Sequence, residues 1–202
     1  MLEFLGLTLH QGTLHQLEHY GDWLRDEASQ AGLLGPAERD RIWERHIVDS
    51  LLFLSALPSR LNAQISVLDV GSGSGLPGIP LGIVRPDWQI TLCERMQRRA
   101  DLLHRIVAIL DLQNVRVVNG DATRLSGGWS VLVTRATLSL EMMVGLCERL
   151  LEPEGCAVAA WSAGGPRPDV EAPQIGSWAL RLHVPPSDIL DPPRRFLIMT
   201  RL

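Results

Sequence analysis

After about residue 60, short apolar runs alternate with helical patterns along the chain. The runs have the composition of strands and lie at residues 65–70, 89–94, 115–120, 130–135, 157–161, 178–184 and 195–202. Between them lie helical patterns such as 95–110, whose apolar stripe is formed by Ala100, Leu103, Val107 and Leu110. This alternation predicts an α/β fold with a mostly parallel sheet and helices on both faces. The last two runs have little helix between them and predict an antiparallel hairpin at one edge.

The first 60 residues contain two helical segments. One covers residues 15–29, and the other begins at Pro36, a residue that suits the first turn of a helix. In the second segment four apolar residues fall on one face and three polar residues on another: Ile42, Ile47, Leu51 and Leu54, against Arg41, Arg45 and Asp49. Because the apolar face needs a packing partner, we expect residues 1–60 to form a helical extension packed on a core domain of residues 61–202.

Composition limits the class of protein. The 202 residues are 46% hydrophobic and carry a net charge of −4, and the longest apolar runs are far too short to span a bilayer. The charge argues against coating nucleic acid by charge alone. The three cysteines are widely spaced and odd in number, which argues against disulfides and a zinc site: Cys93, Cys147 and Cys156. Since the N-terminus shows no export signal, we expect a cytoplasmic protein with no membrane or metal partner.

The stretch VLDVGSGSGLPGIP, residues 67–80, places four glycines at the end of the first expected strand. Glycine at a strand-to-helix turn lets the backbone adopt positive φ and lets a ligand approach the main chain closely. Open α/β sheets bind their ligands at the carboxyl ends of the strands. The stretch therefore predicts a site for a nucleotide-like cofactor.

Two cofactor classes fit this stretch. Gly73, Gly75 and Gly78 have the spacing of a dinucleotide fingerprint, and Glu94 ends the next strand, where an acid would hold ribose hydroxyls. Alternatively, Asp69 stands just before glycines at every second position. A carboxylate there would crowd a pyrophosphate, but it suits a ligand that carries an ammonium group. S-adenosylmethionine is such a ligand and has no phosphate.

The pattern Asp69-x-Gly71-x-Gly73-x-Gly75, followed by Glu94 and by NGDA at 119–122, resembles the cofactor-binding series of class I S-adenosylmethionine-dependent methyltransferases. Three stretches look more narrowly like the small-subunit ribosomal RNA guanine-N7 methyltransferases, also called the glucose-inhibited division protein B family: RHIVDS at 45–50, DVGSGSGLPGIPLGIVRPD at 69–87 and TRA at 134–136. The resemblance covers most of the chain and is weakest in the last third. It implies a Rossmann-like methyltransferase sheet.

The resemblance also implies a set of cofactor-binding residues. The loop from Gly71 to Leu76 would wrap the methionine and ribose portions, Glu94 would take the ribose hydroxyls, and residues 121–123 would line the adenine. The implied set for S-adenosylmethionine is Asp69, Gly71, Gly73, Gly75, Leu76, Glu94, Asp121, Ala122, Thr123 and Arg135. Without a ligand, the same residues could form a tight turn after the first strand, a helix start at Glu94 and a further turn at Asp121.

Two absent motifs narrow the methyl acceptor. Amine methyltransferases commonly carry a Pro-Pro-aromatic motif after the fourth strand, where this chain reads LVTRAT, and no cysteine stands there as cytosine-carbon methylation requires. Guanine N7 has a free lone pair, so methyl transfer needs positioning and no general base. With the resemblance, this implies transfer to guanine 527 of 16S ribosomal RNA in the small ribosomal subunit.

Arg135 is the candidate catalytic residue, since it would contact the target nucleotide or the cofactor edge from the end of the fourth strand. A surface ion pair is its structural alternative. Arg45, His46 and Asp49 could face RNA, but we favour an i,i+4 ion pair between Arg45 and Asp49 with His46 packed between the segments. A further basic series could contact RNA phosphates, but we favour a solvated helix face for its members: Arg95, Arg98, Arg99 and Arg105.

The sequence departs from the family in two places. After the fifth strand the family usually has a Lys-Gly pair, where this chain has Trp161 and Ser162, and the N-terminal segment lacks the family's aromatic-Asn stretch. Both departures concern RNA docking.

The alternatives to a ribosomal RNA methyltransferase are a small-molecule methyltransferase, an NAD(P)-dependent oxidoreductase, and a cofactor-binding module without turnover. We expect a monomer.

Overall fold

The computed structural model describes residues 5, 7–58, 61, 64–135, 138–161, 174–186, 190 and 194–202, without the side chain of Trp161. These residues form one eight-stranded sheet in the order β3-β2-β1-β4-β5-β8-β7-β6. Its strands are β1 Ser66–Val70, β2 Gln89–Glu94, β3 Val115–Asn119, β4 Trp129–Thr134, β5 Leu151–Trp161, β6 Gln174–Ile175, β7 Trp178–His183 and β8 Arg195–Arg201.

Strands β1 to β5 pair in parallel, and β6, β7 and β8 add antiparallel neighbours. The predicted mostly parallel sheet and the antiparallel pairing of the last two expected strands are therefore confirmed. The sequence did not predict β6, whose two residues lie at the edge beyond β7. The order of the strands reverses at β1, which has β2 on one side and β4 on the other. That reversal point is where open α/β sheets leave room for a ligand.

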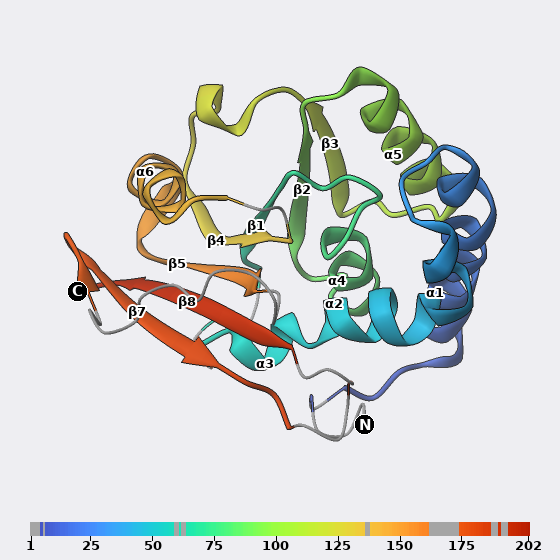
Figure 1. Cartoon of the computed structure of the whole chain (residues 1–202), viewed down its shortest axis with the longest axis horizontal. Coiled ribbons are helices and arrows are strands. Elements are labelled where there is room, and N and C mark those ends of the chain that lie inside the picture. Colours follow the sequence, from blue (N-terminus) through green and yellow to red (C-terminus); the bar gives the residue numbers. More distant parts are fainter. Residues whose placement is uncertain are drawn as a thin grey trace.

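Helices cover both faces of the sheet, as predicted, but unequally (Figure 1). One face carries helical elements from the N-terminal segment and from the crossovers between β1, β2 and β3, whereas α6 packs on the other. The helical elements are α1 Gln11–Trp23, η2 Leu24–Ala28, η3 Pro36–Arg41, η4 Trp43–Val48, α2 Asp49–Leu51, α3 Phe53–Ala56, α4 Gly78–Val84, α5 Gln97–Ile109, η5 Ala122–Arg124 and α6 Leu140–Leu150.

The central strand β1 shows how the two layers divide. Val67 packs into the layer with the N-terminal helices, while Leu68 and Val70 pack into the layer with α6. Alternate residues of a strand point to opposite faces, so Asp69 belongs to the face of Val67. Asp69 thus places a carboxylate at an otherwise apolar position of a central strand, next to the first residue of α4.

The N-terminal segment shares its hydrophobic core with the sheet. Ile42, Ile47 and Leu51 are buried there, as expected from their common face, and Leu54 is half-buried. The division into residues 1–60 and 61–202 falls beside residues 59, 60, 62 and 63, which lie outside the described residues, and it stays a prediction.

The prediction for Asp49 was wrong. It was placed on a polar face with Arg41 and Arg45, yet its side chain is fully buried. The reason is that η4, just before it, is a π-helix, and the wider turn of a π-helix changes which residues share a face.

In α5 the predicted stripe is confirmed for Ala100, Leu103 and Leu110, which are buried. Val107 is only half-buried, and Ile106 fills the fully buried position beside it. Across the described part of the chain, no helix has both the length and the apolar character needed to cross a membrane.

Candidate cofactor site

The glycine loop begins where β1 ends and closes on the neighbouring strand. The backbone N–H groups of Gly71 and Ser72 both donate to the carbonyl oxygen of Cys93 in β2, at 2.9 and 3.1 Å. The loop then turns into α4 through a hydrogen bond from the N–H of Ile79 to the carbonyl oxygen of Gly75, at 2.7 Å. The sequence prediction of a strand-to-helix turn at these glycines is confirmed.

Two glycines of the loop, both with positive φ, have different surroundings. A Cβ atom added to Gly75 would lie 2.4 Å from Cδ1 of Ile79 and 3.2 Å from Cδ2 of Leu103, so this glycine allows close packing. A Cβ atom added to Gly73 would meet nothing nearer than 3.9 Å, the carbonyl oxygen of Gly71. Gly73 therefore faces open space, as a backbone that receives a ligand should.

Asp69 has one carboxylate oxygen in use and one without a partner. Its Oδ2 accepts a hydrogen bond from the backbone N–H of Gly78, 3.0 Å away at the start of α4. Its Oδ1 is buried with no hydrogen-bond partner. Burial raises the pKa of Asp69 to about 7, although the N–H of Gly78 acts in the opposite direction. A buried oxygen of this kind is ready for a donor that carries positive charge.

Glu94 ties the loop to the end of β2. Its Oε2 accepts from the backbone N–H of Gly73 at 3.0 Å, and its Oε1 accepts from the N–H of Met96 at 2.9 Å. The side chain is buried. A carboxylate oxygen has two lone pairs, so each oxygen keeps capacity for one more donor, such as a hydroxyl. Glu94 is more than a solvated helix start, because its carboxylate fixes the main chain of the glycine loop.

Tyr20 of α1 contacts the same loop, and the sequence did not predict this contact. Its hydroxyl donates to the carbonyl oxygen of Ser74 at 2.8 Å, and the whole side chain is buried. Burial raises the pKa of Tyr20 well above its usual value, so the hydroxyl stays protonated and can donate. The contact joins residues 54 positions apart, and no local pattern around Tyr20 signals it.

The residues expected at the adenine lie in and beside η5. Asp121 is exposed, and its Oδ1 accepts from the backbone N–H of Thr123 at 2.8 Å, which lowers the pKa of Asp121. Arg149 of α6 donates to the carbonyl oxygens of Ala122, at 3.0 Å, and of Thr123. The turn predicted at Asp121 is therefore present, and α6 supports it from below.

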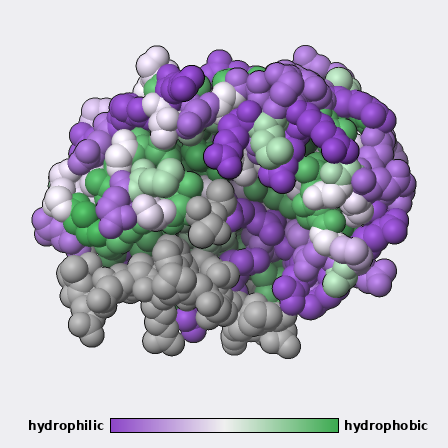
Figure 2. Space-filling view, turned by 45° about the horizontal axis from the view of Figure 1, so that its top comes forward, coloured by the Kyte–Doolittle hydropathy of each residue, from purple (hydrophilic) through white to green (hydrophobic). Residues whose placement is uncertain are grey.

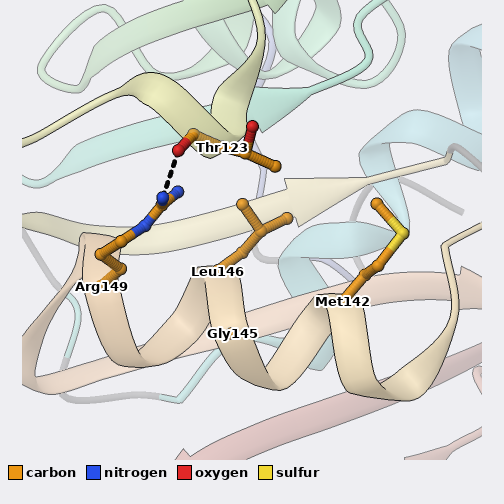
Figure 3. Close-up of a pocket in the computed structure, with 5 residues that line it drawn as sticks. All are labelled: Thr123, Met142, Gly145, Leu146 and Arg149. Carbon is orange, nitrogen blue, oxygen red and sulfur yellow. Dashed lines mark hydrogen bonds between the residues drawn. The ribbon is translucent and has the colours of Figure 1, made fainter.

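Between η5 and α6 lies an open hollow of about 240 Å³, lined by Thr123, Met142, Gly145, Leu146 and Arg149 (Figure 3). Met142 is 48% exposed at its rim. In Figure 2 hydrophobic residues gather on the left, the side where Figure 1 places α6, while the right half is mostly hydrophilic. The turn at η5 thus adjoins an apolar surface.

Arg135 follows β4 and reaches back toward the N-terminal segment. Its Nη2 lies 3.5 Å from Oδ2 of Asp49 and 3.5 Å from Nδ1 of His46. Arg135 therefore forms an ion pair, as its structural alternative predicted. The pair does not lie on the surface, because only 20% of the Arg135 side chain is exposed. Ala136, which follows it in the TRA motif, and Ser162 lie outside the described residues.

The predicted pair between Arg45 and Asp49 was wrong, because Asp49 pairs instead with Arg135 and Arg194. Arg194 precedes β8, in the region where the sequence signal was weakest. His46 is buried, as expected from packing between segments. Of the basic series, Arg105 pairs with Glu27 at 2.6 Å and is exposed, which agrees with a solvated helix. No group of three or more His, Cys, Asp or Glu suited to a metal occurs within the described ranges.

The described geometry brings most of the expected residues to the carboxyl ends of β1, β2, β3 and β4. A sheet of this strand order, with a glycine loop after β1 and helices on both faces, is the fold of class I methyltransferases. A solved structure titled as a putative methyltransferase, yhhF, from Escherichia coli shares the fold with a TM-score of 0.55 and 20% identity, over 77% of this chain and 86% of that one. A mutant of MtNAS in complex with S-adenosylmethionine aligns with a TM-score of 0.62 and 17% identity, over 92% and 76%.

The family is shown by sequence. A family model described as rRNA small subunit methyltransferase G matches residues 13–163, and this chain belongs to that family. The ribosomal RNA small subunit methyltransferase G of Acidothermus cellulolyticus is 41% identical over 69% of this chain, and that of Mycobacterium marinum is 40% identical over 72%. The chain spans 61% and 64% of the length of these two relatives. The resemblance found in the sequence motifs is confirmed.

Proposed function

We propose that this chain transfers the methyl group of S-adenosylmethionine to N7 of a guanine in 16S ribosomal RNA. The observation that carries the proposal is the open backbone at Gly73, whose N–H donates to the buried carboxylate of Glu94, together with the buried carboxylate of Asp69 at the start of α4. In a chain of the rRNA small subunit methyltransferase G family, this arrangement favours S-adenosylmethionine over a dinucleotide.

The residues present fit this cofactor. Asp69 offers a buried, unpartnered Oδ1 to an ammonium group, and Glu94 keeps lone pairs for the ribose hydroxyls. The loop from Gly71 to Leu76 would hold the methionine and ribose portions, and the turn at 121–123 would line the adenine. A pyrophosphate does not fit this site, because the carboxylate of Asp69 next to the loop would repel it. When bound, S-adenosylmethionine supplies an electrophilic methyl group.

The chain's own contribution is mainly positioning. Guanine N7 carries a free lone pair, so no proton has to leave before methyl transfer and no general base is needed. Arg135 would contact the target nucleotide or the cofactor edge, since its Nη1 is buried and has no hydrogen-bond partner. His46 beside it has its pKa lowered to about 4 by burial and by the charge of Arg135, and is therefore neutral at pH 7.

The proposal is tested by methyl transfer from labelled S-adenosylmethionine onto small ribosomal subunits that lack the modification, with protein-free 16S RNA as a second substrate. A guanine methylated at N7 carries a positive charge that labilises the ring and the glycosidic bond. Borohydride and aniline should therefore cut the RNA at one guanine after incubation. At saturating cofactor, the single-turnover rate should be nearly flat between about pH 6.5 and 8.5, because no general base titrates.

Gly73→Val is the control for this assay, since its side chain would fill the space left for the cofactor. It should abolish transfer while the protein stays folded. Label on a cytosine carbon or an adenine amine, with no cut at guanine, would refute the proposed acceptor. Transfer to a small molecule and none to RNA would favour the small-molecule alternative. Binding without any transfer would point to a module without turnover. We further propose that the protein acts as a monomer in the cytoplasm.

A further inference from the structure

Asp49 is a fully buried carboxylate between two arginines. The guanidinium of Arg194 pairs with both of its oxygens, Nε with Oδ1 and Nη2 with Oδ2, the latter at 2.8 Å. Arg135 also lies near Oδ2, which is 3.5 Å from its Nη2. The three residues come from three distant parts of the chain: the N-terminal helical segment, the start of β8 and the end of β4.

Arg194 alone would suffice to neutralise Asp49, because a bidentate guanidinium satisfies both carboxylate oxygens. A second arginine at the same carboxylate therefore needs another reason. Buried ion pairs add little net stability, since desolvating the charges offsets their attraction. Such a pair can instead fix the geometry of its members.

The guanidinium of Arg135 has contacts at Nη2 and no hydrogen-bond partner at Nη1. Its Nη2 faces Asp49 and lies 3.5 Å from Nδ1 of His46, which is neutral and can accept. Its Nη1 is buried without a partner. Burial lowers the pKa of Arg135, while the charges of Asp49, Tyr20 and Asp69 act in the opposite direction.

We propose that Asp49 is a positioning residue, which holds the guanidinium of Arg135 at the site so that Nη1 remains available to a ligand group. The inference rests on the proposed function for the reaction that it serves. It assigns the N-terminal helical segment a part in the site beyond covering the sheet. Arg194 balances the charge of Asp49, and Asp49 places Arg135.

A double-mutant cycle tests this with Asp49→Asn, Arg135→Ala and the double variant. We expect Asp49→Asn to lower the single-turnover rate of methyl transfer about tenfold, because a misplaced group costs rate without being removed. In the Arg135→Ala background the same substitution should change the rate less than about twofold, since coupled residues are not additive. Equal losses in both backgrounds would overturn the proposal and leave Asp49 a structural residue.

Arg194→Gln is the matched control, because it also removes an ion pair of Asp49 but leaves Arg135 its partner. It should lower the melting temperature about as much as Asp49→Asn while slowing transfer less. If the two variants slow transfer in proportion to their loss of melting temperature, the effect is structural and the proposal fails.

A second measurement needs neither activity nor a folded Asp49 variant. In the wild-type protein, the guanidinium of Arg135 should show hindered rotation in side-chain nitrogen NMR, with resolved Nη signals that disappear in Arg135→Ala. Rapid rotation, as in exposed arginines, would overturn the proposal. Should the wild-type protein transfer no methyl group to RNA, the proposed function fails, and this spectrum still decides whether the guanidinium of Arg135 is held in place.

Discussion

The two walls of the candidate site are built differently. On the wall of the glycine loop, Asp69 and Glu94 are buried, and the loop is held by β2, by α4 and by Tyr20 from α1. On the opposite wall, Asp121 and Thr123 are exposed, η5 has three residues, and an open hollow separates it from α6. One wall depends on contacts from distant parts of the chain, and the other on a local turn supported by Arg149.

The two walls should differ in how much a substitution alters stability and ligand binding. A buried and fully packed wall is preorganised, so a substitution there alters stability and binding together. A wall made of an exposed turn can adapt, and a substitution there costs little. The following predictions test this contrast, from the largest expected effect to the smallest.

The largest effect is expected at Gly75. A methyl group there would overlap the buried side chain of Ile79 and would sit on a backbone with φ of +95°. We expect Gly75→Ala to lower the free energy of unfolding by about 4 kcal/mol, from overpacking and backbone strain together. Gly73→Ala is the control, because it carries the strain without the overlap and should cost about 1 kcal/mol. Equal losses in urea unfolding would show that the two glycines do not differ in packing.

The second prediction concerns pH and Asp69. Its folded pKa of about 7 lies above the ordinary value of 3.8 for this side chain, so the folded state binds more protons than the unfolded state between these values. Stability from this group is therefore present at low pH and is lost as pH rises toward 7. Relative to Asp69→Asn, the wild-type protein should lose about 3 kcal/mol between pH 4 and 7, at about 1.4 kcal/mol per pKa unit.

The comparison with Asp69→Asn is needed because His46 acts in the opposite direction. Its folded pKa of about 4 lies below the ordinary value of 6.5 for histidine, so its contribution to stability grows as pH rises through this range. Both proteins share that contribution, and the difference between their unfolding curves isolates Asp69. A difference that does not vary with pH would contradict the burial assigned to this carboxylate.

The third prediction concerns Glu94 and ligand binding. Its removal takes away a charged acceptor and releases the N–H of Gly73, so Glu94→Ala should weaken the binding of S-adenosylmethionine by about 2 kcal/mol in calorimetry. Glu94→Gln keeps one acceptor oxygen and should lose less. If Glu94→Ala binds like the wild-type protein, the ribose contact is wrongly assigned.

The smallest effect is expected at Asp121 on the open wall. Its carboxylate caps η5 through one backbone N–H, that of Thr123, and loss of such a cap costs about 0.5 kcal/mol of stability. Asp121→Ala should therefore leave the melting temperature almost unchanged, while any loss in cofactor affinity would report the adenine contact directly. A large loss of stability would show that this wall is as tightly built as the other.

Local sequence was sufficient where neighbours along the chain decide the structure. The strands other than β6, the turn at the glycine loop and the turn at Asp121 follow from periodicity, from glycine and from a short acceptor side chain. The parallel pairing of β1 to β5 agreed with the alternation of elements, because short crossovers leave few ways to build a parallel sheet. The motifs around Asp69 also identified the family.

Tertiary structure decided what distant residues do to one another. The partners of Asp49 lie 86 and 145 positions away along the chain, whereas local spacing could suggest only near neighbours such as Arg45. Tyr20 reached the glycine loop without any local signal. The sequence by itself determined the fold, the family and the position of the glycine loop, because these depend on local geometry and composition. Which charges are buried together was decided by packing, since burial depends on the whole sheet and its covering helices.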